Sequence, residues 1–247
     1  MPLEPIERKY DLVRHAFSMK VSPHELFTPN MTTKLFTGVV QINHGDTVFD
    51  IGSGLGPLAI WAALEPSRHV YSVEIVKEQY ELAKQNVKDQ SLENKITLYN
   101  GNLFEPIPEG IRADVIIADV SGISEKIARI MSSGEEPWYP CNIPTGGKDG
   151  AEVICAVLEQ AGNYLAPNGR LYYPVAGLSN HQRIEKLAAA KFHNIKEVEK
   201  KRFPLTAEQT EAVICHGLPG TYEIEKRPNG KGAWIGWIYE ASNPQIS

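Results

Sequence analysis

The chain alternates, between residues 47 and 175, between short apolar runs and longer segments whose apolar residues recur at helical spacing. The apolar runs predict strands at 47–50, 69–74, 95–100, 113–119 and 169–175. The helical spacing predicts helices at 57–65, 76–89, 124–132 and 151–165, the last of them ended by Pro167-Asn168-Gly169. Because strands that alternate with helices form parallel sheets covered on both faces, the pattern predicts an α/β fold.

Both ends of the chain add elements to this alternation. Near the N-terminus, apolar residues at helical spacing predict a helix over 6–19: Ile6, Tyr10, Val13 and Phe17. A further helical run is expected at 35–40. Towards the C-terminus the pattern predicts helices at 180–190 and 206–214 and strands at 195–203 and 233–241. We therefore expect an N-terminal helical extension at 1–40 and one α/β domain at 41–247.

A glycine turn joins the first strand of this alternation to its first helix, in the run Val48-Phe-Asp50-Ile-Gly52-Ser-Gly54-Leu-Gly56. Glycines allow a tight turn and let a ligand approach the backbone N–H groups at the start of the helix. The next strand ends in an acid, Glu74, which can accept hydrogen bonds from both hydroxyls of a ribose. Together they predict a site for a nucleoside cofactor.

The glycine spacing indicates which cofactor. A dinucleotide fingerprint is G-x-G-x-x-G, whereas Gly52, Gly54 and Gly56 give G-x-G-x-G. Asp50 stands two residues before the first of them. A carboxylate at that place repels a pyrophosphate and favours a ligand that carries an ammonium and a sulfonium group. This favours S-adenosyl-L-methionine, with a nicotinamide or flavin cofactor as the alternative.

This run resembles motif I of the class I S-adenosylmethionine-dependent methyltransferases, and Glu74 resembles their ribose-binding acid. The segment Asp114-Val-Ile-Ile-Ala-Asp119-Val120-Ser121-Gly122 resembles their motif IV, where the methyl acceptor docks. The resemblance implies a Rossmann-like, mostly parallel sheet of seven strands in the order 3-2-1-4-5-7-6, with strand 7 antiparallel. The residues placed at the cofactor on this basis are Asp50, Gly52, Ser53, Gly54, Gly56, Glu74, Asn102, Leu103 and Asp119.

One branch of these enzymes is especially similar. Glu136-Pro137-Trp138-Tyr139, followed by Gly146-Gly147-Lys148-Asp149-Gly150, looks like the release-factor glutamine methyltransferases and their small-domain relatives. The segment Phe27-Thr28-Pro29-Asn30-Met31-Thr32-Thr33 is similar to the proline–threonine segment by which that branch covers the cofactor. The resemblance therefore implies cofactor contacts for Thr28 and Pro29.

The chain departs from this branch at the acceptor edge. Where the branch has Asn-Pro-Pro-Tyr, which grips a planar amide or aromatic amine, this sequence has Asp119-Val120-Ser121-Gly122. We therefore expect no methylation of a glutamine amide or a base nitrogen. Asp119 can take a proton from a hydroxyl or an amine, or hold a cationic amine, although it could also be a cofactor-loop acid without such a role. Tyr139 lies in the long segment 122–149, which is either a lid over the acceptor or a surface loop.

The methyl acceptor is open at this stage. The function expected is methyl transfer to an amino or hydroxyl group of a small molecule, with Asp119 and Tyr139 as the catalytic set. The alternatives are a protein side chain as acceptor, or chemistry without methyl transfer, such as cyclisation of the cofactor's own aminobutyrate part. A module that binds the cofactor without turnover is a further alternative.

Composition and charge restrict the possible partners, metal sites and cell compartment. The net charge of −5 and the lack of a basic stripe longer than Lys200-Lys201-Arg202 argue against a nucleic-acid partner. Three cysteines without metal-ligand spacing predict no metal site and a reducing compartment. No apolar run has the length that spans a bilayer, and the N-terminus has no signal core, so we expect a cytoplasmic protein without a membrane partner. The oligomeric state is not indicated.

Overall fold

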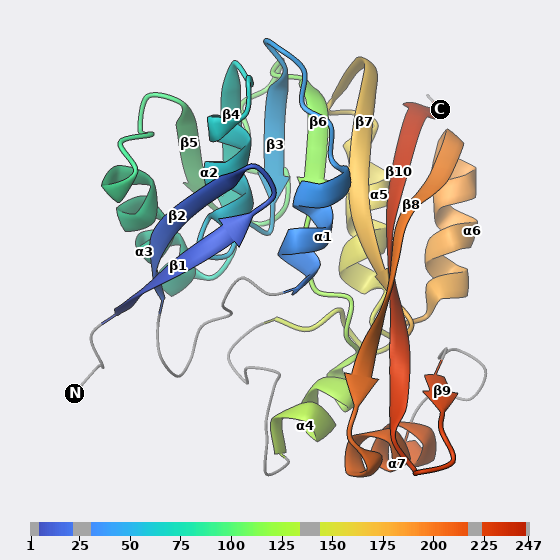
Figure 1. Cartoon of the computed structure of the whole chain (residues 1–247). Coiled ribbons are helices and arrows are strands. Elements are labelled where there is room, and N and C mark those ends of the chain that lie inside the picture. Colours follow the sequence, from blue (N-terminus) through green and yellow to red (C-terminus); the bar gives the residue numbers. More distant parts are fainter. Residues whose placement is uncertain (1–4, 22–30, 134–143, 217–223, 246–247) are drawn as a thin grey trace. The chain divides into compact units, whose positions relative to one another are not determined.

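The computed structural model describes residues 5–21, 31–133, 144–216 and 224–245 (Figure 1). The chain divides into two compact units, of which the first comprises residues 1–119 and 160–172 and the second residues 120–159 and 173–247. Each unit is described by itself. The division into 1–40 and 41–247 stays a prediction. Among the described residues, no helix has the length and apolar character needed to cross a membrane.

The first unit is built on a parallel sheet. Its strands are β3 (Thr47–Ile51), β4 (His69–Glu74), β5 (Ile96–Asn100), β6 (Ala113–Ala118) and the first part of β7 (Leu165–Ala176), in the order β5-β4-β3-β6-β7. Each neighbouring pair is parallel. The helices α2 (Pro57–Leu64) and α3 (Lys77–Asp89) pack against these strands. Every residue of β3 is buried, as expected of the central strand of a sheet covered by helices.

The second unit continues from the last residues of β7. Its strands are β8 (Phe192–Leu205), β9 (Ile224–Lys226) and β10 (Gly232–Pro244), and β10 pairs with β7 and is antiparallel to both β8 and β9. Its helices are α4 (Glu125–Ser133), α5 (Glu152–Ala161), α6 (His181–Lys191) and α7 (Ala207–His216). Followed through β7, the strand order is β5-β4-β3-β6-β7-β10-β8. The expected order 3-2-1-4-5-7-6 is confirmed, with β9 as an additional short strand.

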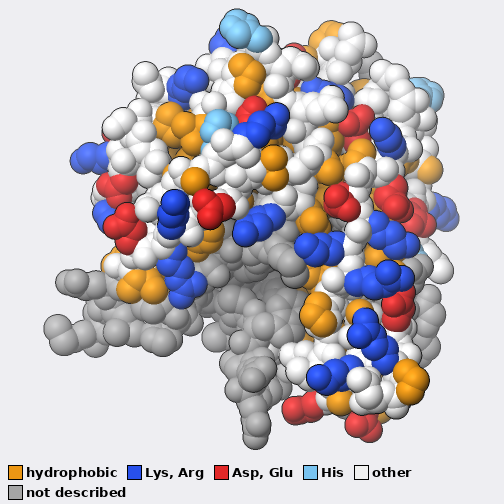
Figure 2. Space-filling model, viewed as in Figure 1, with side chains coloured by type: hydrophobic (Ala, Val, Ile, Leu, Met, Phe, Trp, Pro, Cys, Tyr) orange, Lys and Arg blue, Asp and Glu red, His pale blue; other side chains and the backbone are white. Residues whose placement is uncertain are grey.

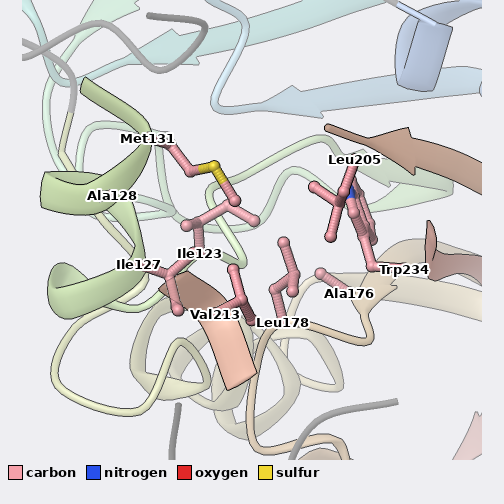
Figure 3. Packing of buried hydrophobic residues seen from close by; sticks show 9 residues of the cluster. All are labelled: Ile123, Ile127, Ala128, Met131, Ala176, Leu178, Leu205, Val213 and Trp234. Atoms are coloured by element: carbon pink, nitrogen blue, oxygen red, sulfur yellow. The ribbon is translucent and has the colours of Figure 1, made fainter. Parts of the chain in front are cut away.

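A hydrophobic cluster forms the core of the second unit (Figure 3). Ile127 and Met131 are one helical turn apart on α4 and share its buried face. The cluster comprises Ile123, Ile127, Ala128, Met131, Ala176, Leu178, Leu205, Val213 and Trp234. Phe203 of β8 stacks on Trp234 of β10, with ring centroids 4.2 Å apart. The cluster therefore connects α4 with the antiparallel strands and with α7.

The predicted N-terminal helix over 6–19 is wrong. The strands β1 (Ile6–Leu12) and β2 (His15–Val21) form an antiparallel hairpin instead. At the turn between them, Arg14 adopts a left-handed φ of 70°. The buried residues of β2 follow a period of two, since Phe17, Met19 and Val21 face inward. The helical spacing of apolar residues in this stretch is coincidental, because Tyr10 and Phe17 share one face in a helix and are also directly opposite each other in the hairpin. A helix does follow at α1 (Met31–Val39).

The predicted end of helix 151–165 is also wrong. Helix α5 ends at Ala161, and β7 already begins at Leu165, so Pro167-Asn168-Gly169 lies inside a strand. Asn168 has a left-handed φ of 64°, and the pairing of β7 with β6 shifts register between Ala113 and Val115. The turn residues therefore form an irregularity at the start of β7 rather than a stop after a helix.

Candidate functional site

The glycine turn between β3 and α2 has an unusual backbone. Gly52, Gly54 and Gly56 have φ values of 78°, 55° and 87°, a region that residues with a Cβ rarely adopt. The N–H groups of Gly52 and Ser53 both donate to the carbonyl of Val73 on β4, at 2.9 and 3.0 Å. The turn is thus anchored to the end of the neighbouring strand, and Gly56 caps the start of α2.

Glu74 holds this turn through its carboxylate. One carboxylate oxygen accepts a hydrogen bond from the N–H of Gly54 and the other from the N–H of Val76, each at 2.7 Å. The side chain is 5% exposed, and burial raises its pKa although the backbone hydrogen bonds oppose the rise. Glu74 therefore fixes the shape of the glycine turn. Its contact with a ribose stays a prediction.

Asp50 lies at the centre of the sheet and is fully buried. Neither of its carboxylate oxygens has a partner of good hydrogen-bond geometry in the described part of the chain, and the hydroxyls of Ser53 and Ser72 are in the same position. Ser72 is the registered neighbour of Asp50 on β4, so both side chains face the same side of the sheet. Burial first, and then the nearby carboxyl of Asp119, raise the pKa of Asp50 well above its usual range, with the backbone N–H of Ala59 opposing.

Asp119 follows the end of β6 and contacts helix α1. The hydroxyl of Thr33 donates to a carboxylate oxygen of Asp119 at 3.4 Å. Asp119 keeps partial contact with solvent, yet the protein atoms around its carboxyl raise its pKa to about 7, and the hydrogen bond from Thr33 opposes the rise. Thr33 lies in the threonine-containing segment noted above but was not among the predicted site residues. No local sequence signal singles out Thr33, because its role depends on the packing of α1 beside Asp119.

The three carboxyls share one electrostatic property. Asp50, Glu74 and Asp119 form no ion pair with a lysine, arginine or histidine in the residues that the structure describes. A buried carboxyl without a cation is costly to ionise. A positively charged ligand would supply the missing charge and lower the pKa of each group.

The comparisons with known proteins agree with this geometry. Residues 31–143 match a family described as a methyltransferase domain. The match covers 113 of the 247 residues, which is slightly less than half of the chain. The matched range includes the glycine turn and all three carboxyls. The resemblance to class I S-adenosylmethionine-dependent methyltransferases, stated from the sequence, is thereby confirmed.

Proteins similar to this chain lie in the expected branch. The release factor glutamine methyltransferase of Bacillus cereus is 30% identical over 65% of this chain and 59% of that protein. The ribosomal protein uL3 glutamine methyltransferase of Bordetella pertussis is 30% identical over 55% of this chain and 45% of that protein. The chain thus spans about half the length of the curated relatives that it matches. A ribosomal protein L11 methylase from Lactobacillus delbrueckii shares the fold, with a TM-score of 0.56 and 18% identity over 90% of this chain and 84% of that one.

The loop after β5 carries the two other predicted cofactor residues, Asn102 and Leu103. The side-chain N–H of Asn102 donates to Glu105 at 2.9 Å, which leaves the Asn102 amide oxygen as an acceptor. Leu103 has a left-handed φ of 46°, a conformation that costs energy for a residue with a Cβ. Asn100 ties this loop to β4, because its side-chain N–H donates to the carbonyl of Glu74 at 2.8 Å. The roles of Asn102 and Leu103 at an adenine stay predictions.

The remaining predicted residues are not placed together with these. Thr28, Pro29 and Tyr139 lie outside the described residues. Ser121 and Gly122 belong to the second unit, whereas Asp119 ends the first stretch of the first unit.

The Gly146–Gly150 motif holds the chain that follows Asp119. Within the second unit, the N–H of Gly146 donates to the carbonyl of Ile123 at 2.7 Å, and the N–H of Glu125 donates to the carbonyl of Gly147 at 2.9 Å. Asp149 anchors the motif, since Arg183 donates to both of its carboxylate oxygens at 3.2 Å. The motif therefore sets the backbone path of residues 122–125.

No metal site emerges from the described residues: no group of three or more histidine, cysteine, aspartate or glutamate side chains could hold an ion. The prediction of metal-independent chemistry stays a prediction. Basic and acidic side chains are interspersed on the face that Figure 2 displays. Along β8 the lysines Lys196 and Lys200 alternate with Glu197 and Glu199 in the same way.

Proposed function

We propose that this protein transfers a methyl group from S-adenosyl-L-methionine to an acceptor. The observation that carries the proposal is the set of three carboxyls around the glycine turn, none of which has a cationic partner among the described residues. S-adenosylmethionine carries both a sulfonium and an ammonium group. The similarity of residues 31–143 to a methyltransferase domain supports the same reading.

Each of the predicted residues would bind a different part of the cofactor. Asp50 and the glycine backbone would orient the methionine part of the cofactor, Glu74 the ribose, and Asn102 the adenine. The acceptor's lone pair attacks the methyl carbon, and the sulfonium leaves as a neutral thioether. Because the reactivity belongs to the cofactor, the protein contributes mainly by positioning the two partners.

Asp119 would face the acceptor. An amine or hydroxyl loses one proton in the overall reaction, and a carboxyl whose pKa is about 7 can take that proton near neutral pH. We therefore propose an amino or hydroxyl group as the acceptor, on a small molecule. The replacement of Asn-Pro-Pro-Tyr by Asp119-Val120-Ser121-Gly122 argues against a planar amide.

A protein side chain is the second candidate acceptor. Its support is the similarity to proteins named release factor and ribosomal protein uL3 glutamine methyltransferases. None of these relatives suggests a small-molecule acceptor. The two candidates differ in the size of the product rather than in the chemistry of the site.

Incubation of the protein with methyl-labelled S-adenosylmethionine distinguishes these functions. A mixture of small metabolites and a mixture of proteins, each from a cell extract, are offered separately, and Asp119→Asn serves as the impaired control. Label in a small metabolite supports the first candidate, and label in protein supports the second. Release of labelled methylthioadenosine without an acceptor would instead indicate cyclisation of the cofactor's aminobutyrate part, because the methyl group then stays on the sulfur. Failure of the wild-type protein to bind S-adenosylmethionine in calorimetry would overturn the proposal as a whole.

A further inference from the structure

Asn86 is a buried amide on α3 that the proposed function does not use. Its side-chain oxygen accepts a hydrogen bond from the N–H of Lys20 at 2.7 Å. Its side-chain N–H group donates to the carbonyl of Lys20 at 3.1 Å and to the carbonyl of Leu55 at 3.0 Å. Lys20 belongs to the N-terminal hairpin, whereas Leu55 stands between two glycines of the turn. One side chain therefore bonds two segments that are 35 residues apart in sequence, by the numbers of Lys20 and Leu55.

The chemistry of an amide suits this place. A carboxamide offers an acceptor oxygen and two N–H donors, and Asn86 uses all three. A carboxylate of the same shape would keep the bond from the Lys20 N–H but would have no donor for either carbonyl. A hydrocarbon would leave all three backbone groups unpartnered in a buried place, which is costly.

The bond to Leu55 fixes the orientation of one peptide plane in the glycine turn. The carbonyl of Leu55 and the N–H of Gly56 belong to the same planar peptide unit. Asn86 holds the carbonyl side of that unit, while the carbonyl of Ser53 accepts from the N–H side at 2.9 Å. The peptide is therefore held from both sides, at the point where the turn enters α2.

We infer that Asn86 is a positioning residue that makes the N-terminal hairpin part of the cofactor site, by holding the Leu55–Gly56 peptide in its ligand-binding orientation. The inference rests on the proposed function, because the ligand in question is S-adenosylmethionine. Asn86 itself does not touch the ligand. It acts through the glycine turn, whose backbone would lie against the methionine part of the cofactor.

The hairpin has other side-chain attachments, and among the described residues none of these hydrogen bonds and ion pairs reaches residues 52–56. The side-chain N–H of Gln90, the residue that caps the C-terminal end of α3, donates to the carbonyl of Ser18 at 2.9 Å. Lys20 forms an ion pair with Asp89 at 2.9 Å, and the indole N–H of Trp61 donates to the carbonyl of Val13 at 3.0 Å. Gln90 is thus a matched control, because it joins the C-terminal end of the same helix to the same strand and has no side-chain hydrogen bond to residues 52–56 in the described part of the chain.

The test compares Asn86→Ala with Gln90→Ala in the full-length protein. Calorimetry with S-adenosylmethionine should show about tenfold weaker binding for Asn86→Ala and less than about twofold for Gln90→Ala. At saturating cofactor, kcat should stay close to wild type while KM for the cofactor rises in Asn86→Ala. Equal weakening by the two variants, or unchanged affinity in Asn86→Ala, would overturn the inference.

Amide hydrogen exchange supplies a readout that needs no cofactor. The N–H of Gly56 should exchange about tenfold faster in Asn86→Ala and at the wild-type rate in Gln90→Ala. Should Asn86→Ala fail to fold, Asn86→Asp replaces it, since it keeps the acceptor for the Lys20 N–H and loses the donors to Leu55 and Lys20. Unchanged exchange at Gly56 would refute the positioning role even if the proposed function failed on its own test.

Discussion

Asp119 is the residue whose charge state matters most for the proposed chemistry. With a pKa of about 7, its carboxyl changes from the protonated form to the ionised form, which can accept a proton, as the pH rises through neutrality. We expect kcat/KM, which reports the free enzyme, to increase with pH around that value. Removal of the hydroxyl in Thr33→Val should raise the pKa of Asp119 further, because that hydrogen bond favours the ionised form. The measurement is a pH–rate profile, and its midpoint should move to higher pH.

The matched control for that profile is Thr37→Val. Thr37 lies one turn further along α1, and its hydroxyl donates to the carbonyl of Lys34 at 3.1 Å rather than to Asp119. Its midpoint should equal that of the wild type. A midpoint that stays in place in Thr33→Val, or moves to lower pH, would contradict the assignment.

Glu74 holds the glycine turn and is the proposed ribose ligand, so its removal should affect both the stability of the fold and the binding of the cofactor. In Glu74→Ala the N–H groups of Gly54 and Val76 lose their acceptor, so we expect a loss of about 1–3 kcal/mol in the free energy of unfolding. Affinity for S-adenosylmethionine should fall in calorimetry, while circular dichroism shows a folded protein. Glu81→Ala is the control, because Glu81 is an exposed acid on α3 whose one ion pair among the described residues is with Lys84. Wild-type affinity in Glu74→Ala would rule out the ribose assignment.

At the level of elements, the backbone of the Gly146–Gly150 motif packs closely against residues 122–124, and Gly150 leaves no room there for a side chain. A Cβ at Gly150 would lie 2.8 Å from the Cβ of Ser179 and 3.0 Å from both the carbonyl of Gly122 and the N–H of Ser124. We expect Gly150→Ala to lower the free energy of unfolding by at least about 2 kcal/mol in urea denaturation. Gly110→Ala is the control, with a similar φ of 85° but nothing within 4 Å of the added carbon, and should cost only about 1 kcal/mol. Equal losses would mean that the contact with residues 122–124 is loose.

The elements differ in how far the sequence could predict them. Strand β4 begins and ends where its apolar run does, at His69 and Glu74, because both faces of a central parallel strand are buried. The hairpin β1–β2 was missed because the spacing of apolar residues within 6–19 fits a helix equally well. What favours the hairpin is its packing against α2 and α3, which is a tertiary contact. The strand predicted at 169–175 is shorter than β7 for a related reason. Pro167-Asn168-Gly169 is typical of a turn, whether it follows a helix or interrupts a strand.

For the molecule as a whole, the raised pKa values predict how stability depends on pH. A carboxyl whose pKa is higher in the folded state holds a proton that the unfolded chain releases, so it favours folding at low pH and loses that contribution as the pH rises. For Asp119 the loss should fall between the ordinary carboxyl value near 4 and about 7. Thermal unfolding of the wild type and of Asp119→Asn across this range measures it. The wild type should lose stability relative to the variant as the pH rises, and a relative gain would contradict the shift.

The sequence by itself determined the alternation of strands and helices, the glycine turn and the acids that follow two strands. These features depend on neighbours within a few residues, where spacing and backbone preferences act directly. Only the tertiary structure decided which side chains complete the site. The bonds from Thr33 to Asp119 and from Asn86 to Lys20 join residues separated by 86 and 66 positions. No local pattern records such a pairing, because it depends on how the elements pack and on which buried polar groups must find partners.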